Sequence, residues 1–212
     1  MTRARDLSQT AGGTFAGDIN VSNGTIKLDG NYPVGTDNVA LGDTALDSLT
    51  SGNFNTVFGA KALTANTEGS FNVAAGRLAL TSNTTGQHNA AIGADALQGN
   101  TTGSYNTALG NTALALNTTA SNNTAVGYQA MYSYQTGGDN VALGTQAGYS
   151  INGNGNSTFI GRSAGYSTTG GNNTFIGYNS GNSVTSGSKN TIVGAYNGNQ
   201  GGLDIRTSSN NI

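Results

Sequence analysis

The chain has 212 residues, a formal net charge of −2 at pH 7, 34 glycines and one proline, and only 8% of its residues are charged. It contains no cysteine and a single histidine, which excludes a disulfide framework, a thiolate zinc site and a cysteine nucleophile. No basic patch is present to attract a nucleic acid, and no apolar run reaches the length of a membrane span, so we expect neither partner.

Residues 1–35 precede a long repeat and differ from it in pattern. The stretch GDINVSNGTIKLDG alternates apolar and polar residues around Asn23-Gly24, which is typical of a β-hairpin. The opening residues MTRARDLSQTAGG are charged and lack the apolar core of a signal peptide, so they predict no classical secretion. Two roles stay open for residues 1–35: a cap over the edge of the first repeat, or an attachment segment.

The motif Asn-x-φ-φ-Gly, in which φ is an apolar residue, recurs ten times within residues 36–198. Its intervals are seventeen residues except for one of sixteen, and Ser157 replaces the asparagine once. Such a period predicts a solenoid, and it is too short for a pair of packed helices. The motif begins at positions 38, 55, 72, 89, 106, 123, 140, 157, 173 and 190.

Thr, Val, Ile and Phe fill the motif and favour β-strand. We interpret each repeat as one coil that contains a short strand, a turn, a second short strand and a glycine turn. Coils stacked at about 4.8 Å would form a rod roughly 45 Å long. The recurrent asparagine would form a ladder of amide hydrogen bonds. The glycine three residues before it, as at Gly69, would adopt φ > 0, and Ala120 replaces this glycine in one coil.

Both faces of the predicted strand are apolar. The middle residue, such as Ala108, and the next one, such as Leu109, point to opposite faces of a strand, and both are apolar in every copy. A strand that is apolar on both sides is normally buried on both sides. Because a thin solenoid can bury only its inside, the sequence predicts self-association through the other face.

Two positions exchange volume along the chain. In the early copies the middle residue is small, and the residue six positions later is leucine or methionine; in the last copies the large residue is in the middle, as at Phe159, and the later position is glycine. Packed interiors accept volume-conserving exchanges more readily than holes. We therefore expect the two positions to fill one shared space, with Phe159 against Gly148 or Gly165.

No catalytic or metal-binding pattern stands out. His88 and Asp95 lack a nucleophile, Glu68 is the only glutamate, and Asp43 and Asp47 read as solvated turn residues. We expect no catalytic residue, no cofactor, no metal site and no enzymatic activity. A polysaccharide depolymerase stays open as an alternative that incubation with host polysaccharide would test.

Three surface patterns allow other interpretations. Asn-x-Thr triplets at Asn83, Asn100 and Asn117 match glycosylation acceptors, but the repeat generates them automatically. Paired threonines beside the turn glycines could form an ice-binding ladder. An outward aromatic strip could contact sugars or simply cover the edges of the coils, and it consists of Tyr128, Tyr149, Tyr166 and Tyr178.

The repeats resemble the left-handed parallel β-roll of trimeric autotransporter adhesin heads (YadA-like), in which three identical chains form one trimer. Copies such as NTALGNTALALNTTASNNTAVGYQAM, residues 106–131, are still more similar to repeat arrays of phage tail fibres. The opening MTRARDLS and the ending GNQGGLDIRTSSNNI resemble fibres of marine phages and cyanophages. No heptad stalk and no membrane anchor follow the repeats, which favours a virion fibre over a bacterial adhesin.

The resemblance implies an all-β, left-handed β-roll of about ten coils, assembled as a homotrimer in a virion tail fibre. Residues 1–35 would attach to the phage tail, baseplate or an adaptor protein, residues 36–198 would form the array, and residues 199–212 a C-terminal tail. The protein would act as a rigid spacer, with host surface glycans as further partners. A trimeric adhesin head on a bacterial surface and an ice-binding solenoid stay open as alternatives.

Overall fold

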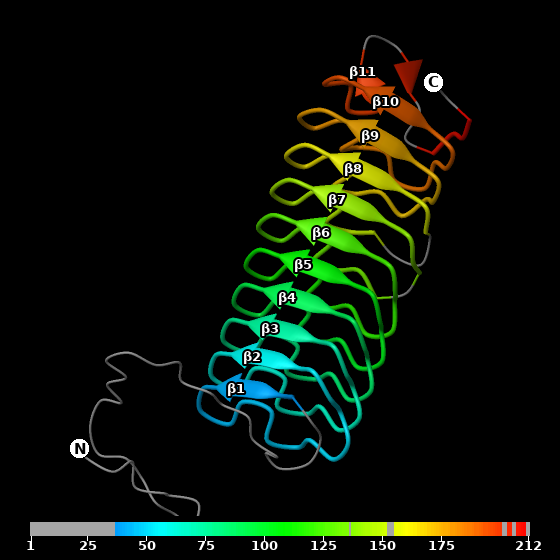
Figure 1. Cartoon of the computed structure of the whole chain (residues 1–212). Helices are drawn as coiled ribbons and strands as arrows, with labels where there is room; N and C mark the ends of the chain where they lie inside the picture. The colour runs from blue at the N-terminus through cyan, green and yellow to red at the C-terminus, as the bar shows by residue number, and fades with distance from the viewer. Residues whose placement is uncertain (1–36, 136, 152–154, 201–202, 205–206, 211–212) are drawn as a thin grey trace, which may run out of the picture.

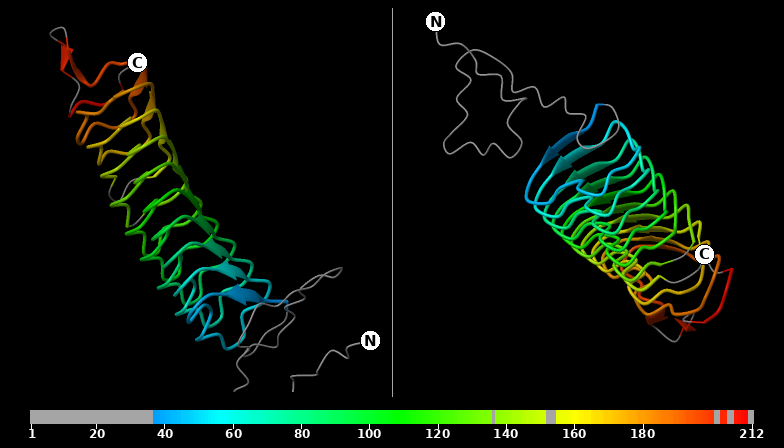
Figure 2. Two further views of the ribbon diagram at one scale, coloured as in Figure 1. Left: turned by 90° about the vertical axis from the view of Figure 1, so that its left-hand side faces the viewer. Right: turned by 90° about the horizontal axis from the view of Figure 1, so that it is seen from below.

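The computed structural model describes residues 37–135, 137–151, 155–200, 203–204 and 207–210, and it forms an all-β parallel solenoid (Figure 1). No helix occurs among these residues. Ten strands of three residues each, one per coil, pair in chain order into a single parallel sheet along one side of the rod (Figure 2). The predicted β-solenoid with coils of about seventeen residues is confirmed.

Each strand coincides with the apolar part of one motif. The ten strands of the sheet are β1 (Val39–Leu41), β2 (Thr56–Phe58), β3 (Val73–Ala75), β4 (Ala90–Ile92), β5 (Thr107–Leu109), β6 (Thr124–Val126), β7 (Val141–Leu143), β8 (Thr158–Ile160), β9 (Thr174–Ile176) and β10 (Thr191–Val193). Equivalent residues face each other across every pairing, as Ala108 faces Ala125. A short antiparallel pair, β11 (Asn199–Gln200) with β12 (Leu203–Asp204), follows.

The prediction of a second strand in each coil is wrong for the described residues. The residues after the closing glycine form consecutive turns, because two of them adopt left-handed backbone conformations that an extended strand cannot contain. In the fifth coil these are Thr112, with φ +53°, and Leu114, with φ +51°. Neighbouring coils still pair here through their backbones: the Leu114 amide donates to the Ala130 carbonyl at 3.0 Å.

The glycine three residues before each motif asparagine recurs along the chain for a different reason than predicted. Gly69 and its described equivalents do not adopt positive φ, except Gly137 at +110°. Instead, a Cβ at Gly69 would collide with the Gly86 carbonyl oxygen of the next coil and with Oδ1 of Asn66. The close approach of the coils therefore selects glycine at this corner. Ala120 also lies outside the positive-φ region, so it carries no backbone strain.

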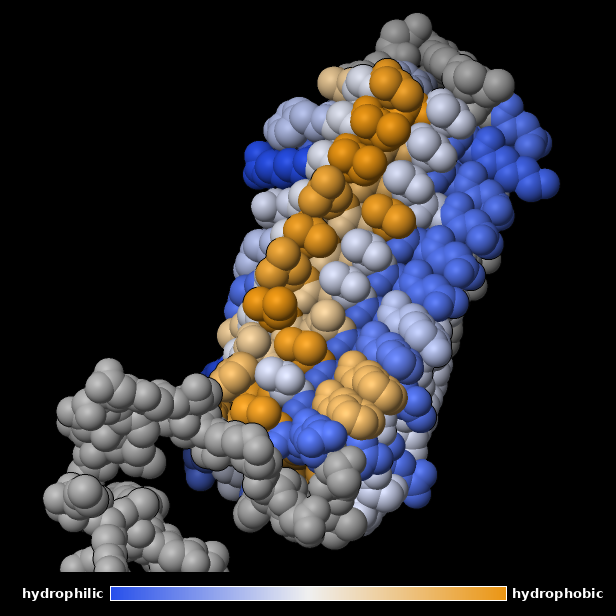
Figure 3. All heavy atoms as spheres, in the orientation of Figure 1, coloured by the Kyte–Doolittle hydropathy of each residue, from blue (hydrophilic) through white to orange (hydrophobic). Residues whose placement is uncertain are grey.

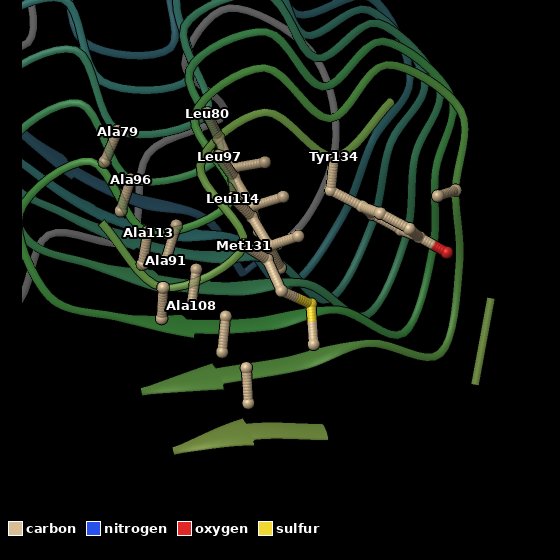
Figure 4. Close-up of a cluster of buried hydrophobic side chains, with 14 of the residues drawn as sticks. Ala79, Leu80, Ala91, Ala96, Leu97, Ala108, Ala113, Leu114, Met131 and Tyr134 are labelled. Atoms are coloured by element: carbon tan, nitrogen blue, oxygen red, sulfur yellow. The ribbon is translucent and has the colours of Figure 1, made fainter. Parts of the chain in front are cut away.

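The middle residue of each strand points into the rod and forms its core. Figure 4 shows Ala91 and Ala108 of the sheet facing a file of larger side chains from the opposite wall, which consists of Leu80, Leu97, Leu114 and Met131. All of these side chains are buried. The first and third residues of the strands therefore point outward, and the large apolar side chains at these positions are not covered by the chain itself.

The predicted shared space exists and lies within one chain. Phe159 and Phe175 are fully buried, and their rings lie 5.6 Å apart in a tilted arrangement. A Cβ added to Gly165 would collide with the Phe159 ring, and one added to Gly148 would lie 3.0 Å from it. The phenylalanine thus occupies the volume that leucine fills in earlier coils, and it fits against both glycines.

The predicted asparagine ladder is confirmed as a column of buried amides that Ser157 interrupts once. From Asn38 to Asn123 the side-chain oxygen of each asparagine accepts two bonds from the asparagine of the next coil: Asn89 Oδ1 accepts from the Asn106 backbone at 3.0 Å and from its Nδ2 at 3.2 Å. The same Nδ2 donates to the Ala120 carbonyl at 2.8 Å. Asn140, Ser157 and Asn173 each accept one bond, from the backbone amide of the next coil. The column thereby satisfies buried polar groups that would otherwise cost stability.

A second asparagine ladder was not predicted. Asn66, Asn83, Asn100 and Asn117 are fully buried, and each Nδ2 after the first donates to the Oδ1 of the preceding one, as from Asn100 to Asn83 at 2.8 Å. Three of these residues are the Asn-x-Thr triplets of the sequence, so their amides lie inside the folded rod. The ladder ends where Tyr134 replaces asparagine, and the buried Oδ1 of Asn117 has no hydrogen-bond partner.

Because of Tyr134, the stability of the rod should depend on pH in the alkaline range. Its hydroxyl accepts a 2.7 Å bond from Asn140 Nδ2, and burial raises the pKa of Tyr134 from 10.0 to about 12. Between these pKa values the folded chain keeps a proton that the unfolded chain has lost, so stability present below pH 10 should fall as the pH approaches 12. The full difference corresponds to roughly 3 kcal/mol.

Chemical denaturation at a series of alkaline pH values measures this loss. In the matched variant Tyr134→Phe the decline should be smaller by this amount, because phenylalanine has no hydroxyl to ionise. The variant should still fold, since Asn140 Nδ2 retains the Gly138 carbonyl at 2.9 Å and the Asn123 side chain at 3.1 Å. Parallel pH profiles of the two proteins would contradict the assignment.

Two expectations concern the segments at the ends of the array. The expected hairpin and cap in residues 1–35 lie outside the described residues. Part of the expected C-terminal tail lies against the last coil: Asn190 Nδ2 donates to the Ser208 carbonyl at 3.0 Å, and the Asn210 amide donates to the Ser188 carbonyl at 3.0 Å. These contacts match those between earlier coils, such as the 2.9 Å bond from Asn173 Nδ2 to the Gly187 carbonyl.

Candidate functional site: the outer face of the sheet

An exposed line of apolar side chains runs along the whole rod. The third residue of every strand points outward, and Leu109 and Leu143 are exposed at 45% and 47%, while Val193 reaches 75%. Figure 3 shows these residues as a continuous stripe over the sheet. We call this set the outer apolar column; it consists of Leu41, Phe58, Ala75, Ile92, Leu109, Val126, Leu143, Ile160, Ile176 and Val193.

A second column beside it also carries no charge. The first residue of each strand is valine, alanine or threonine: Val39, Thr56, Val73, Ala90, Thr107, Thr124, Val141, Thr158, Thr174 and Thr191. The two columns share the outer face of one regular sheet. Long contiguous apolar surfaces of this kind are rare on monomeric proteins and mark contact surfaces. The outer face is therefore the strongest candidate for an interaction site.

A ladder of aromatic rings borders the N-terminal half of this face. Phe54, Phe71, His88 and Tyr105 are exposed and occupy equivalent positions just before the asparagine of four successive coils. Their rings stack at centroid distances of 4.9, 4.8 and 4.9 Å with interplanar angles of 16° or less. His88 is exposed as predicted, but the sequence reading missed its place in this stack.

The stacked rings partly offset the backbone strain at their own positions. All four residues have φ between +56° and +60°, a conformation that costs roughly 1–2 kcal/mol for residues with a Cβ. Higher coils place Asn122, Asp139 or Asn156 there, and such residues adopt this conformation more readily. Each aromatic pair returns about 0.5–1.5 kcal/mol. Stacking therefore accounts for the ladder without a ligand.

The tyrosines expected to form one outward strip lie in two columns. Tyr149 and Tyr166 stack at 4.8 Å, together with Tyr132 at 5.3 Å from Tyr149. Tyr128 and Tyr178 lie in the other column, beside the closing glycines, and are exposed at 50% and 56%. Burial, and after it the neighbouring phenols of Tyr166, Tyr132 and Tyr128, raise the pKa of Tyr149.

The acidic residues and the histidine considered from the sequence do not assemble into a catalytic group. Asp95 pairs with Arg77 at 3.5 Å and accepts a 3.4 Å bond from Gln98, while His88 lies in the aromatic ladder. Asp43, Asp47 and Glu68 are exposed. Among the described residues, no group of three or more His, Asp or Glu side chains is arranged to hold a metal ion. No helix in the described part of the chain could cross a membrane.

In the threonine pairs before Gly86 and Gly103, the first threonine uses its hydroxyl within the fold. Thr84 Oγ1 donates to the Thr101 carbonyl at 3.1 Å, and Thr101 Oγ1 donates to the Thr118 carbonyl at 2.9 Å. These hydroxyl protons are therefore committed to the backbone of the next coil. This corner is less suited to ordering water than the threonine-containing outer face.

The chain was compared with protein-family models, curated proteins and solved structures. No family model, no curated protein and no solved structure matches this chain.

Proposed function

We propose that the protein is a structural fibre component that assembles as a homotrimer through the outer face of its sheet. The observation that supports this proposal is the outer apolar column, which leaves Leu41, Leu109 and Leu143 nearly half exposed along an uncharged sheet face. Burying apolar surface stabilises an assembly by about 25 cal/mol per Å². Repetition in every coil makes this contribution grow with the length of the rod.

In a closed assembly of identical chains, one kind of apolar surface on each chain is enough to form every contact. Three parallel rods around a common axis would turn their apolar columns inward, coil against coil, and closed symmetry leaves no open end for lateral growth. The resemblance to tail-fibre and YadA-like repeats favours three chains and a left-handed winding. The same resemblance favours a role in a phage virion, in which residues 1–35 would attach to the tail, baseplate or an adaptor.

The mechanism of such a fibre is mechanical. Every coil is bonded to the next through sheet, turn backbone and the asparagine column, so bending must disturb many hydrogen bonds together. The trimer would hold a host-recognition surface away from the particle and present it in three copies. Repeated weak contacts then give high avidity without a strong single site.

Charges in the outer apolar column should dissociate the assembly. In Leu109→Asp/Leu143→Asp, burying two carboxylates per chain at the contact would be strongly unfavourable. Light scattering should give three times 21.2 kDa for the natural protein and one chain mass for the variant. The control Thr85→Asp/Asn111→Asp changes exposed residues away from the outer face and should remain trimeric. A natural protein of 21.2 kDa in dilute and concentrated solution would contradict the proposal.

Two alternatives use the same fold. A trimeric adhesin head would also associate through the outer face, and a coiled-coil stalk and membrane anchor encoded in the same gene would favour it. An ice-binding solenoid would instead leave the face open. The supporting observation is the regular column that includes the exposed Thr107, Thr124 and Thr191. Thermal hysteresis by a single-chain species would decide for this alternative.

A further inference from the structure

One stretch of the rod, outside the two columns of the outer face, is rich in aromatic, amide and hydroxyl side chains. It covers the turns that follow β6, β7, β8 and β9. We call it the tyrosine strip, and it comprises three parallel columns: Tyr128, Thr145, Arg162 and Tyr178; Gln129, Gln146, Ser163 and Asn179; and Tyr132, Tyr149 and Tyr166.

Contacts within the tyrosine strip hold its side chains in register. Gln146 Nε2 donates to Gln129 Oε1 at 3.0 Å, and the Arg162 guanidinium lies over the Tyr178 ring at 5.8 Å. Tyr132, Tyr149 and Tyr166 stack against one another, so they offer ring edges and hydroxyls to a ligand. Tyr128 and Tyr178 belong to no ring stack in the described structure, and half of each side chain is exposed.

Arg162 gives the tyrosine strip a positive group that is available to a ligand. It is exposed, and no carboxylate among the described residues pairs with it. Arg77 occupies the equivalent position in the third coil, but it is paired with Asp95 at 3.5 Å. No acidic residue belongs to the tyrosine strip, whereas Asp43, Asp47 and Asp95 lie at the corresponding positions of the lower coils.

The same columns carry no aromatic residue in the first five coils. The first column begins there with Asp43, Ala60, Arg77, Ala94 and Asn111. The fold therefore does not require tyrosine at these positions, in contrast to a core position. Stacking accounts for Tyr132, Tyr149 and Tyr166 as it does for the aromatic ladder of the earlier coils. It does not account for Tyr128 and Tyr178, which belong to no ring stack among the described residues, so these two need another explanation.

We propose that the tyrosine strip binds a linear polysaccharide that carries carboxylate groups, such as a uronic-acid polymer. The proposal rests on the proposed function, since it names the ligand class for a fibre that contacts host surfaces. The ring of Tyr128, and the face of the Tyr178 ring that Arg162 does not cover, can pack against the C–H faces of sugar rings. Amides and phenols bond hydroxyls, and Arg162 pairs with a carboxylate. Columns that repeat at about the spacing of paired strands suit a ligand that itself repeats.

An oligomer of mannuronic acid tests the proposal, with a neutral cello-oligosaccharide of equal length as the comparison. Because the chain has nine tyrosines and no tryptophan, intrinsic fluorescence reports on tyrosine environments directly. The acidic oligomer should change this fluorescence in a saturable manner, and the neutral one should bind about tenfold more weakly or not at all. Equal or stronger binding of the neutral oligomer would overturn the assignment of an acidic ligand.

Matched variants locate the site. Arg162→Gln and Tyr178→Ala should each weaken binding about tenfold, whereas Arg77→Gln and Tyr105→Ala change equivalent chemistry elsewhere and should bind as the natural protein does. All four side chains are exposed, and melting curves verify folding. Equal losses in all four variants, or no saturable binding by the natural protein, would overturn the proposal. Light scattering separates the two proposals, because a trimer that ignores the oligomer contradicts only the ligand assignment.

Discussion

Replacing Phe159 with alanine should lower the free energy of unfolding by about 3–5 kcal/mol per chain. The ring is fully buried and touches the positions of Gly148 and Gly165, which cannot extend a side chain to fill the hole. Chemical denaturation, or the melting temperature of the protein, measures the loss. Leu116→Ala is the control: this side chain is also large and apolar, but it is 39% exposed and lies outside both the core and the outer apolar column.

A compensating change makes the test specific for the shared space. Gly165→Leu alone should be at least as damaging, because its Cβ would collide with the Phe159 ring. Phe159→Ala/Gly165→Leu recreates the pair that Ala108 and Leu114 form in the fifth coil, and Leu114 adopts φ +51°, close to the +61° of Gly165. The double variant should therefore recover stability relative to both single ones. Strictly additive losses would show that the two positions do not share one space.

Replacing Asn106 with alanine should be comparably damaging. Its side chain accepts bonds from the Asn123 backbone and Nδ2 at 3.0 and 3.1 Å, and it donates to Asn89 Oδ1 and the Ala120 carbonyl. Truncation leaves the buried Asn123 backbone amide without this acceptor, which costs about 1–3 kcal/mol. It also removes three further bonds worth about 0.5–1.5 kcal/mol each, although Asn89 Oδ1, the Ala120 carbonyl and Asn123 Nδ2 each keep another partner. The expected loss of unfolding free energy is therefore several kcal/mol, measured by denaturant titration.

The chain itself supplies the control for this variant. Ser157 occupies the same column, and its Oγ accepts the Asn173 amide at 3.1 Å, so serine preserves one of the contacts. Asn106→Ser should therefore cost less than Asn106→Ala. If both substitutions were neutral, the ladder would not contribute to stability, and the stacking of coils would depend on apolar packing alone.

Much of this architecture was predictable because each position of the repeat is observed ten times in one sequence. The alternation within Asn-x-φ-φ-Gly fixes which residues share a face, and the exchange of leucine for Phe159 across the interior follows from constant volume. Both depend on composition at fixed spacing, which a single sequence contains. The inward direction of Ala108 and the outward direction of Leu109 could not be told apart, because both faces are apolar.

The turns were less predictable because their backbone conformations are unusual for their residue types. Leu114 and Tyr105 both have positive φ, which residue preferences assign to glycine, asparagine or aspartate. Repetition stabilises them, since every neighbour has the same geometry. The second asparagine ladder was missed for another reason: Asn83 and Asn100 follow turns whose direction the sequence does not reveal. A seventeen-residue recurrence of asparagine was the available signal.

The uniform register between neighbouring coils has a consequence for how such rods evolve. A coil with a leucine-filled interior contacts neighbouring coils of similar cross-section. Duplication or deletion of whole repeats would therefore lengthen or shorten the rod by about 4.8 Å per coil without disturbing either end. The step must be a complete period, and it must fall inside a block rather than at the boundary near Gly148, where the filling of the interior changes. Slippage between near-identical repeats of the gene would thus change the length of the rod in fixed steps of one coil.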